Sequence, residues 1–399
     1  MQAVWDFIFG AGWLANLATY ITITTALLVA GPVMMMLFTW IERRGIAYMQ
    51  DRKGPNRVGP FGLLQPVAEA IKTMTKEDIT PIGADRWVHF LAPVVVMFST
   101  IMAFAVIPWG NLIPVDINVG VLFIVAVSGL HTLGMLMAGW GSNNKFARLG
   151  GMRAAAQMIS YEIPQVMSLV AIVMLAGTMS IKTIVLNQAD WFGFGWYVFT
   201  PVGLLAFLLF FISSLAEGER TPFDIPEADS EIVAGYMTEY SGMKFAVFFL
   251  ANYMTNLAIC AVAAGIFLGG GAGPGSSIPF IGTLLSIVYF LAKTIGLFFV
   301  MVWIRGTFPR LRVDQLMTFA WKFLLPLALV NIFSTSLWVG LTQWGAEQGF
   351  GFVDGFSYPV RLVLAYLVTG AINLGAFFFV VRLNTRRATT TYQPSPSTV

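Results

Sequence analysis

Charge, cysteine and histidine are all scarce in this sequence. Of its 399 residues, 11% are charged and 57% are hydrophobic. That is too little polar surface to cover a water-soluble globule of this length, so the chain must be solvated by lipid. No basic tract of the kind that binds nucleic acid is present. The net charge of +3 is less informative about the protein than the positions of the charges along the chain.

Redox and metal sites need ligands that the sequence lacks. Its one cysteine, Cys260, excludes an internal disulfide and cannot supply the several thiolates of an iron–sulfur cluster. His89 and His131 are the only histidines, and neither has a second histidine at ligand spacing. We expect both to be hydrogen-bonded helix residues, no metal site in this chain, and any redox cofactor in a partner.

Long apolar runs predict an all-α, polytopic membrane protein with about nine transmembrane helices, because a helix of roughly 20 residues crosses the hydrocarbon core. Residues 1–382 are expected to form one membrane domain, and residues 383–399 a disordered cytoplasmic tail. The loops on the opposite side are expected to be short, or loose and glycine-rich as at 269–275. The predicted spans are 20–41, 88–107, 119–140, 165–186, 197–215, 245–268, 281–304, 321–339 and 359–381.

Lysine and arginine predict the orientation, since these residues collect on cytoplasmic loops. The opposite loops hold only Lys182, while Lys293, Lys322 and Arg361 lie within or at the edges of spans. This split places the N-terminus outside and the C-terminus in the cytoplasm. The residues on the cytoplasmic side are Arg43, Arg44, Arg52, Lys53, Arg57, Lys72, Lys76, Arg86, Lys145, Arg148, Arg153, Arg220, Lys244, Arg305, Arg310, Arg312, Arg382, Arg386 and Arg387.

The cytoplasmic segment after the first span contains a second kind of helix signal. Within residues 61–72, Leu64, Val67, Ala68 and Ile71 share one face at helical spacing, which predicts an amphipathic helix at the membrane surface or between spans. Glu69 lies beside this apolar stripe, where a carboxylate is costly unless it faces water or a partner. A helix that only anchors the loop is the alternative.

Carboxylates crowd the segment 217–231 around the single Arg220. Like-charge neighbours have coupled proton affinities, which suits the segment to holding and passing protons. A solvated acidic surface that docks a basic partner is the alternative. Glu217 favours the first interpretation because it directly follows an apolar run, and Glu162 has a similar position at the opening of another.

Basic residues near the seventh span leave two interpretations open. Arg305 and Arg310 either set the topology or form ion pairs with the acidic segment. Lys293 lies near the middle of the span, where an ammonium group is costly and usually has a pathway or partner role.

Long motifs in this order resemble the H subunit of the proton-pumping NADH:quinone oxidoreductase, respiratory complex I, the family of the mitochondrial first core membrane subunit. The resemblance covers about residues 40–385 and is more specific than any one short pattern. Its motifs are RKGPNRVGP and GLLQP in 52–66, SNNKF in 142–146, RAAAQMISYE in 153–162, PFDIPEA and EYSGMKF in 222–245, DQLM in 314–317, and Trp321 with Lys322.

The resemblance implies a subunit of a proton-translocating enzyme in the bacterial plasma (inner) membrane, with no redox centre of its own. Electrons from NADH then pass through flavin and iron–sulfur clusters in partner subunits to a quinone substrate. The implied partners are the other membrane and peripheral subunits, quinone and lipid. An ion-coupled secondary transporter and the related subunit of membrane-bound hydrogenases are alternatives, although we detect no inverted repeats of the transporter kind.

The same resemblance implies three sets of site residues. The quinone chamber is expected at Glu42, Arg43, Arg52, Val67, Ala70, Phe223, Asp224 and Tyr240. The proton-coupling carboxylates are expected to be Glu69, Glu162, Glu217, Glu227, Asp229 and Glu231. Their charge partners are expected to be Arg220, Lys293, Arg305 and Arg310.

One position departs from the family pattern. Asn252 stands where the family commonly has Glu, and an amide cannot exchange protons. Either water bridges a gap in the carboxylate route or this relative couples differently.

Overall fold

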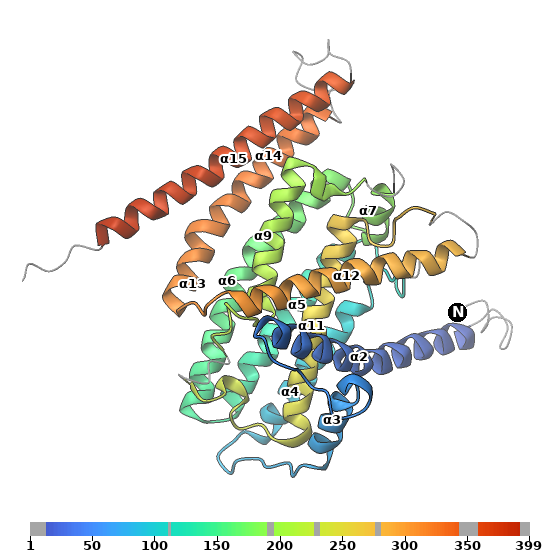
Figure 1. Ribbon diagram of the computed structural model, residues 1–399, viewed down its shortest axis with the longest axis vertical. Helices are drawn as coiled ribbons and strands as arrows, with labels where there is room; N and C mark the ends of the chain where they lie inside the picture. The colour runs from blue at the N-terminus through green and yellow to red at the C-terminus, as the bar shows by residue number, and fades with distance from the viewer. Residues whose placement is uncertain are drawn as a thin grey trace, which may run out of the picture.

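The computed structural model describes residues 13–110, 113–189, 195–226, 232–275, 281–342 and 358–391. Within these ranges the regular structure is helical and no β-strand occurs, which confirms the all-α prediction. Figure 1 shows a bundle from which α14 and α15 extend together at one end. The long helices are α2 (Trp13–Met49), α4 (Arg86–Phe104), α5 (Gly120–Gly141), α6 (Lys145–Ala176), α9 (Pro201–Glu217), α11 (Gly242–Leu268), α12 (Ile281–Thr307), α14 (Leu325–Thr342) and α15 (Tyr358–Thr391).

Shorter elements connect the long helices. The short α-helices are α3 (Gln65–Thr75), α7 (Ile181–Asn187) and α13 (Val313–Phe319). The 3₁₀ turns are η1 (Pro60–Gly62), η2 (Tyr197–Phe199) and η3 (Gly235–Met237). A π-helical turn, η4 (Ala320–Leu324), joins α13 to α14 without a break in the helix.

Seven helices in the described residues are long and apolar enough to cross a membrane. Two of the nine predicted spans are not among them: the first falls within α2, and the fifth falls on α9, an apolar helix of 17 residues. The seven are α4, α5, α6, α11, α12, the continuous helix Val313–Thr342, and Pro359–Asn384 within α15.

The predicted span 165–186 is wrong at both ends. Helix α6 begins 20 residues earlier, at Lys145, where Asn144 caps it by accepting a hydrogen bond from the Phe146 amide at 2.9 Å. It ends at Ala176 because Gly177 adopts a left-handed conformation, with φ of 67°, and its N–H bonds to the Val173 carbonyl. The basic residues of the first turns concealed the helix from a hydropathy analysis.

A capping side chain marks the start of two helices near the site, α4 and α9. Asp85 accepts hydrogen bonds from the amides of Trp87 and Val88 at the start of α4. Thr200 accepts one from Gly203, with Pro201 in the first turn of α9. Both arrangements satisfy amides that have no partner inside the helix.

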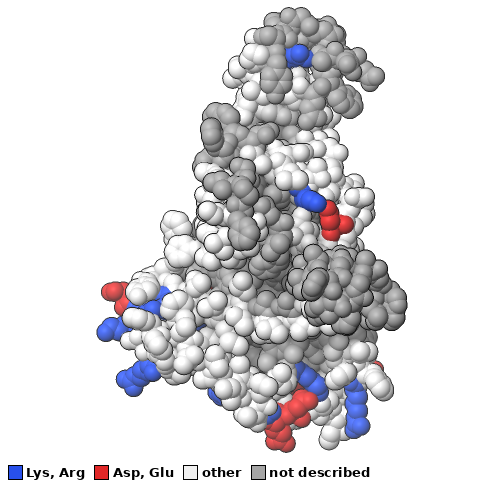
Figure 2. Space-filling view, turned by 90° about the vertical axis from the view of Figure 1, so that its right-hand side faces the viewer, with Lys and Arg blue, Asp and Glu red and all other residues white. Residues whose placement is uncertain are grey.

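The central helices pack closely enough to bury several polar groups. Helix α4 packs against α5 and α11, and α6 packs against α5, α9 and α14. Helix α15 packs mainly on α14 and exposes apolar side chains such as Phe378, as expected for a lipid-facing helix. Most of the charged side chains visible in Figure 2 lie at the lower end of the molecule.

The loop after α11 is packed, which corrects the expectation of a loose glycine-rich connection at 269–275. Gly269 to Gly273 are buried. The Lys293 ammonium group donates hydrogen bonds to the carbonyls of Leu268, Gly270 and Ala272 at 2.7–2.9 Å. The lysine therefore satisfies carbonyls at the C-terminal end of α11, where a cation also complements the helix dipole.

Candidate functional site

Glu42, near the C-terminal end of α2, lies at the centre of a buried ion-pair cluster. Its side chain is 2% exposed. One carboxylate oxygen accepts hydrogen bonds from Arg220, at 2.7 Å, and from Arg305. The Arg220 guanidinium also lies over the Tyr253 ring, 4.3 Å from its centroid. Two guanidinium groups therefore converge on one buried carboxylate, and that of Arg305 is still 35% exposed at its side chain.

A second ion pair ties α3 to α2 one residue further along. Arg43 donates to Glu69, and Gln65 adds a hydrogen bond at 3.3 Å. Burial by itself opposes ionisation of Glu69, but the hydrogen bonds from Arg43 and Gln65 and the charge of Arg43 outweigh it and hold the pKa of Glu69 below its ordinary value of 4.5. Glu69 is therefore an ionised partner of Arg43, so the carboxylate beside the apolar stripe does face a partner.

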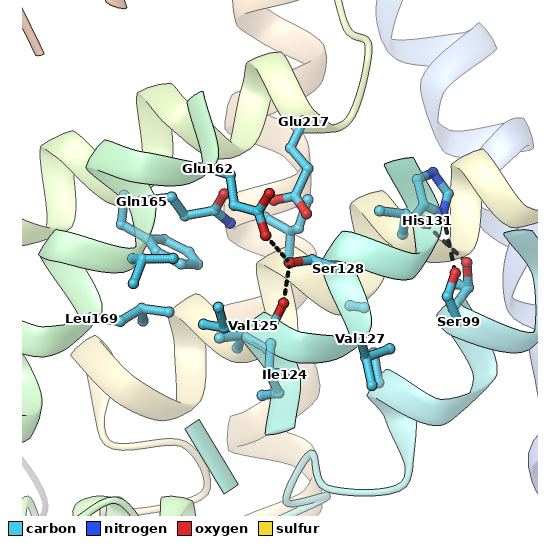
Figure 3. A pocket seen from close by; sticks show the side chains of 18 residues that line it. Ser99, Ile124, Val125, Val127, Ser128, His131, Glu162, Gln165, Leu169 and Glu217 are labelled. Carbon is cyan, nitrogen blue, oxygen red and sulfur yellow. Dashed lines mark hydrogen bonds between the residues drawn. The ribbon is translucent and has the colours of Figure 1, made fainter. Parts of the chain in front are cut away.

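Glu162 and Glu217, predicted as coupling carboxylates, line one cavity of about 60 Å³ between α4, α5, α6, α9 and α11. Figure 3 shows the two carboxyl groups directed into it, although the residues are far apart in the sequence. Apart from a few hydroxyl and amide groups, the lining is apolar, including Val125 and Leu169. Apolar walls make an uncompensated charge in the cavity costly.

The polar lining groups can serve either protonation state of Glu162. The Ser128 hydroxyl lies 3.2 Å from the Glu162 carboxyl and 2.8 Å from the Val125 carbonyl. Because a hydroxyl has one hydrogen and two acceptor lone pairs, it can donate to an ionised carboxylate or accept from a protonated one. His131 lines the same cavity and lies 3.4 Å from the Ser99 hydroxyl.

The described part of the acidic segment folds around α6. Gln157 donates to the Ala216 and Phe223 carbonyls at 2.8 and 2.7 Å. Asp224, which is 7% exposed, pairs with Arg310 at 2.9 Å, in agreement with the ion-pairing alternative for the basic residues after the seventh span. The segment is thus packed at one face rather than wholly solvated.

The remaining predicted chamber residues occupy different environments. Phe223 is buried against Tyr161, and Tyr240 stacks on His89 with ring centroids 4.0 Å apart. Arg52 is exposed and donates to Gln50. The structure therefore does not bring all predicted chamber residues to one surface. On α3, Val67 and Ala70 are half-buried.

The last four predicted site residues are Glu227, Asp229, Glu231 and Lys293. Glu227, Asp229 and Glu231 lie outside the described residues. Lys293 contacts backbone carbonyls, as described above, and is 12 positions before Arg305 on α12, about 18 Å along the helix axis. It is therefore separated from the ion pairs of Glu42.

Sequence reasoning missed two titratable residues. His131 could have been suspected only from its place on an apolar helix, a weak signal. Glu219 is 3% exposed and accepts hydrogen bonds from the Tyr236 hydroxyl at 2.9 Å and from the Asn252 amide at 3.4 Å. Its burial could not be inferred from a segment that looks uniformly acidic.

The site offers carboxylates and guanidinium groups but no ligand set for a metal in the part of the chain that the structure describes. Cys260 is a buried free thiol.

Comparison with known proteins gives a consistent family. The chain matches the sequence model of the NADH dehydrogenase family over residues 21–336. It is 48% identical over 305 residues to the H subunit of NADH-quinone oxidoreductase from Dehalococcoides mccartyi strain CBDB1, covering 76% of this chain and 82% of the relative. Identity is 49% over 308 residues to an H subunit of the same enzyme from Geobacter metallireducens, covering 75% and 89%. It is 47% over 328 residues to the H subunit from Geobacillus kaustophilus, covering 82% and 95%.

Proposed function

Because the chain belongs to the NADH dehydrogenase family, among the H subunits of NADH-quinone oxidoreductase, we propose that it forms the quinone-access chamber of that enzyme and couples quinone reduction to proton translocation. The observation that carries this proposal is the cavity shared by Glu162 and Glu217. Both carboxylates are predicted from the sequence as coupling groups, and the two residues are 55 positions apart on different helices. The family match also removes the secondary transporter from consideration, and the relatives' names favour the quinone enzyme over the hydrogenase.

The chamber is proposed at the ends of α2 and α3. Arg43 and Glu69 join these two helices, and Val67 and Ala70 lie on the same short helix as Glu69. The guanidinium groups of Arg220 and Arg305, which meet at Glu42, can stabilise a reduced, anionic quinone intermediate by their charge. A change of charge there alters the local field, and a nearby buried carboxyl group can respond by changing its protonation.

The proposal includes nine spans, an outside N-terminus and the cytoplasmic placement of α3. Helices α2 and α9 supply the two spans beyond the seven long apolar helices: α2 has 37 residues, and α9 packs against α6 and α11. NADH is the proposed electron donor, and its flavin and iron–sulfur clusters belong to partner subunits. Quinone is the proposed substrate, and lipid surrounds the spans.

Replacement of either cavity carboxylate tests the proposal. Glu217→Gln and, separately, Glu162→Gln keep the size and hydrogen-bonding capacity of the side chain but remove its exchangeable proton. We expect each variant to lower both quinone reduction and proton pumping by about tenfold or more, since proton transfer by a positioned group contributes on the order of 10²–10⁴-fold. The measurements are NADH:quinone turnover and proton uptake in vesicles that contain the assembled complex.

Two controls separate coupling from assembly. Electron transfer from NADH to a soluble acceptor should stay near the wild-type rate, because it does not use the membrane site. Asp116→Asn removes a carboxylate from an exposed pair with Lys182 and should change neither activity. Wild-type turnover and pumping in both Gln variants would show that these carboxylates have no coupling role.

A further inference from the structure

Glu219 occupies an unusual place for a carboxylate, directly after the end of α9. The helix ends at Glu217, and Glu219 adopts a left-handed backbone conformation with φ of 50°. A residue with a Cβ rarely adopts this conformation without a reason in the surrounding structure. Here the turn directs a carboxylate that is only 3% exposed toward Tyr236 and Asn252. The acidic side chain is thus held inside the protein.

The same turn connects three parts of the candidate site. Glu217 lines the cavity that contains Glu162. Glu219 contacts Tyr236 and Asn252. Arg220 pairs with Glu42 at 2.7 Å. Residues 217–220 therefore connect the proposed coupling cavity, the buried ion-pair cluster and a third polar contact. Glu219 is the carboxylate at that third contact.

A hydrogen-bonded pair of asparagines connects Glu219 to the surroundings of Glu42. Asn256 is fully buried and lines a small cavity of about 10 Å³ together with Glu42, Arg220 and Arg305. Its amide donates to the Asn252 side-chain oxygen at 3.0 Å and to the Gly218 carbonyl at 3.1 Å.

This network determines which way the Asn252 amide faces. Its oxygen is already an acceptor for Asn256, so its NH₂ group is the side that faces Glu219. The reverse orientation would bring the amide oxygen against a carboxylate oxygen and the NH₂ group against that of Asn256. In the contact between positions 219 and 252, the carboxylate of Glu219 accepts and the amide of Asn252 donates. The contact therefore accommodates a single carboxylate.

From these contacts we propose that Glu219 is a proton-holding carboxylate of the coupling route, and that positions 219 and 252 form one site that requires a carboxylate at either position. Asn252 cannot exchange protons and acts as a positioning residue. Glu219 takes up one proton as its O–H bond forms and releases it as that bond breaks, so the side chain returns to its starting state. This inference rests on the proposed coupling function and on the contact between the Asn252 amide and the Glu219 carboxylate.

Exchange of the two side chains tests the inference in the assembled complex. Glu219→Gln should lower quinone reduction and proton pumping by about tenfold or more. Adding Asn252→Glu to that variant should restore most of both activities, because the carboxylate returns to the shared site. Asn252→Glu alone should lower them, since two like charges then meet in a buried contact. All rates are divided by the NADH-to-soluble-acceptor rate, so a partial assembly defect cancels.

The non-additive rescue distinguishes proton holding from a structural role. Gln at position 219 can still accept the Tyr236 hydrogen bond, so a purely structural role predicts little loss in Glu219→Gln and no gain from Asn252→Glu. Wild-type activity of Glu219→Gln, or failure of Asn252→Glu to restore it, would overturn the inference. If the Glu162 and Glu217 variants lose activity while Glu219→Gln does not, only this inference fails; wild-type activity in all three removes the proposed function as well.

Discussion

At the residue scale, Glu42 shows how tightly this protein balances charge in a place that excludes water. One carboxylate faces two arginines contributed by the acidic segment and by α12, and only Arg305 retains substantial exposure, at 35% of its side chain. Removing one member of a buried ion pair leaves the other charges uncompensated, which is more harmful than never having had the pair. The stability of the chain therefore depends on this carboxylate, which the proposed function also places at the quinone chamber.

Removing one partner of a buried ion pair usually costs about 3–5 kcal/mol of stability. We predict that Glu42→Gln lowers the free energy of unfolding by an amount near the lower end of this range, because the Arg305 side chain can partly regain contact with water. The labelling rate of the buried thiol of Cys260, followed by mass spectrometry of this chain within the complex, reports the opening free energy. The matched change Asp116→Asn, in a pair with both partners about half exposed, should cost less than about 1 kcal/mol. Equal labelling rates for the two variants would contradict the prediction.

At the scale of the element, one side of α3 is held to α2 by an ion pair, and its other side exposes apolar side chains. Glu69 holds it to α2 through Arg43. Several apolar side chains of the helix and the turn before it remain exposed, including Ile71 and Phe61 at 58% and 70%. An apolar face left open on a helix at the edge of a membrane protein indicates contact with lipid, substrate or another subunit.

Two alanines of α3 permit a matched test of the chamber. Ala68 is exposed and Ala70 half-buried, and the two are about 200° apart around the helix. We expect Ala70→Trp to reduce NADH:quinone turnover severalfold by filling the passage, while NADH oxidation by a soluble acceptor continues.

Ala68→Trp adds the same bulk on the other face and should have the smaller effect on quinone turnover. The comparison is made at several quinone concentrations, since a narrowed passage raises the apparent KM. Equal losses of quinone turnover in both variants would exclude Ala70 as a specific part of the passage wall.

At the scale of the whole molecule, the charged side chains visible on the face shown in Figure 2 are unevenly distributed. The visible charged side chains gather mainly at the end that contains α3 and the start of α4 (Figures 1 and 2). The proposed coupling cavity lies between helices, away from that surface. A protein with this arrangement can receive a charged or polar substrate at one end and transmit its effect through buried groups.

The orientation can be checked with single cysteines, because the native thiol at Cys260 is buried. Lys182→Cys, whose native side chain is 50% exposed, should react with a membrane-impermeant reagent from outside. Arg382→Cys, at an exposed position near the end of α15, should react only from the cytoplasmic side. Labelling in vesicles of both orientations measures this. Reaction of the cysteine at 182 from the cytoplasmic side alone would reverse the topology.

The sequence alone determined the properties that depend on local composition. Apolar runs predicted an all-α membrane protein. The scarcity of cysteine and histidine favoured proton chemistry over a redox or metal centre in this chain. It also identified Glu162 and Glu217 as carboxylates next to apolar runs. Helix ends were less accessible, as α6 shows, because buried small residues and a left-handed glycine decide them rather than hydropathy.

Only the tertiary structure decided which of these groups meet. Glu162 shares a cavity with Glu217, Glu42 meets Arg220 and Arg305, and Asn252 faces Glu219. It also showed that Glu69 is held by an arginine rather than isolated at an apolar edge. Such contacts join residues far apart in the chain, and they depend on how helices pack and how turns direct side chains. Hydropathy and charge order along one dimension do not contain that information.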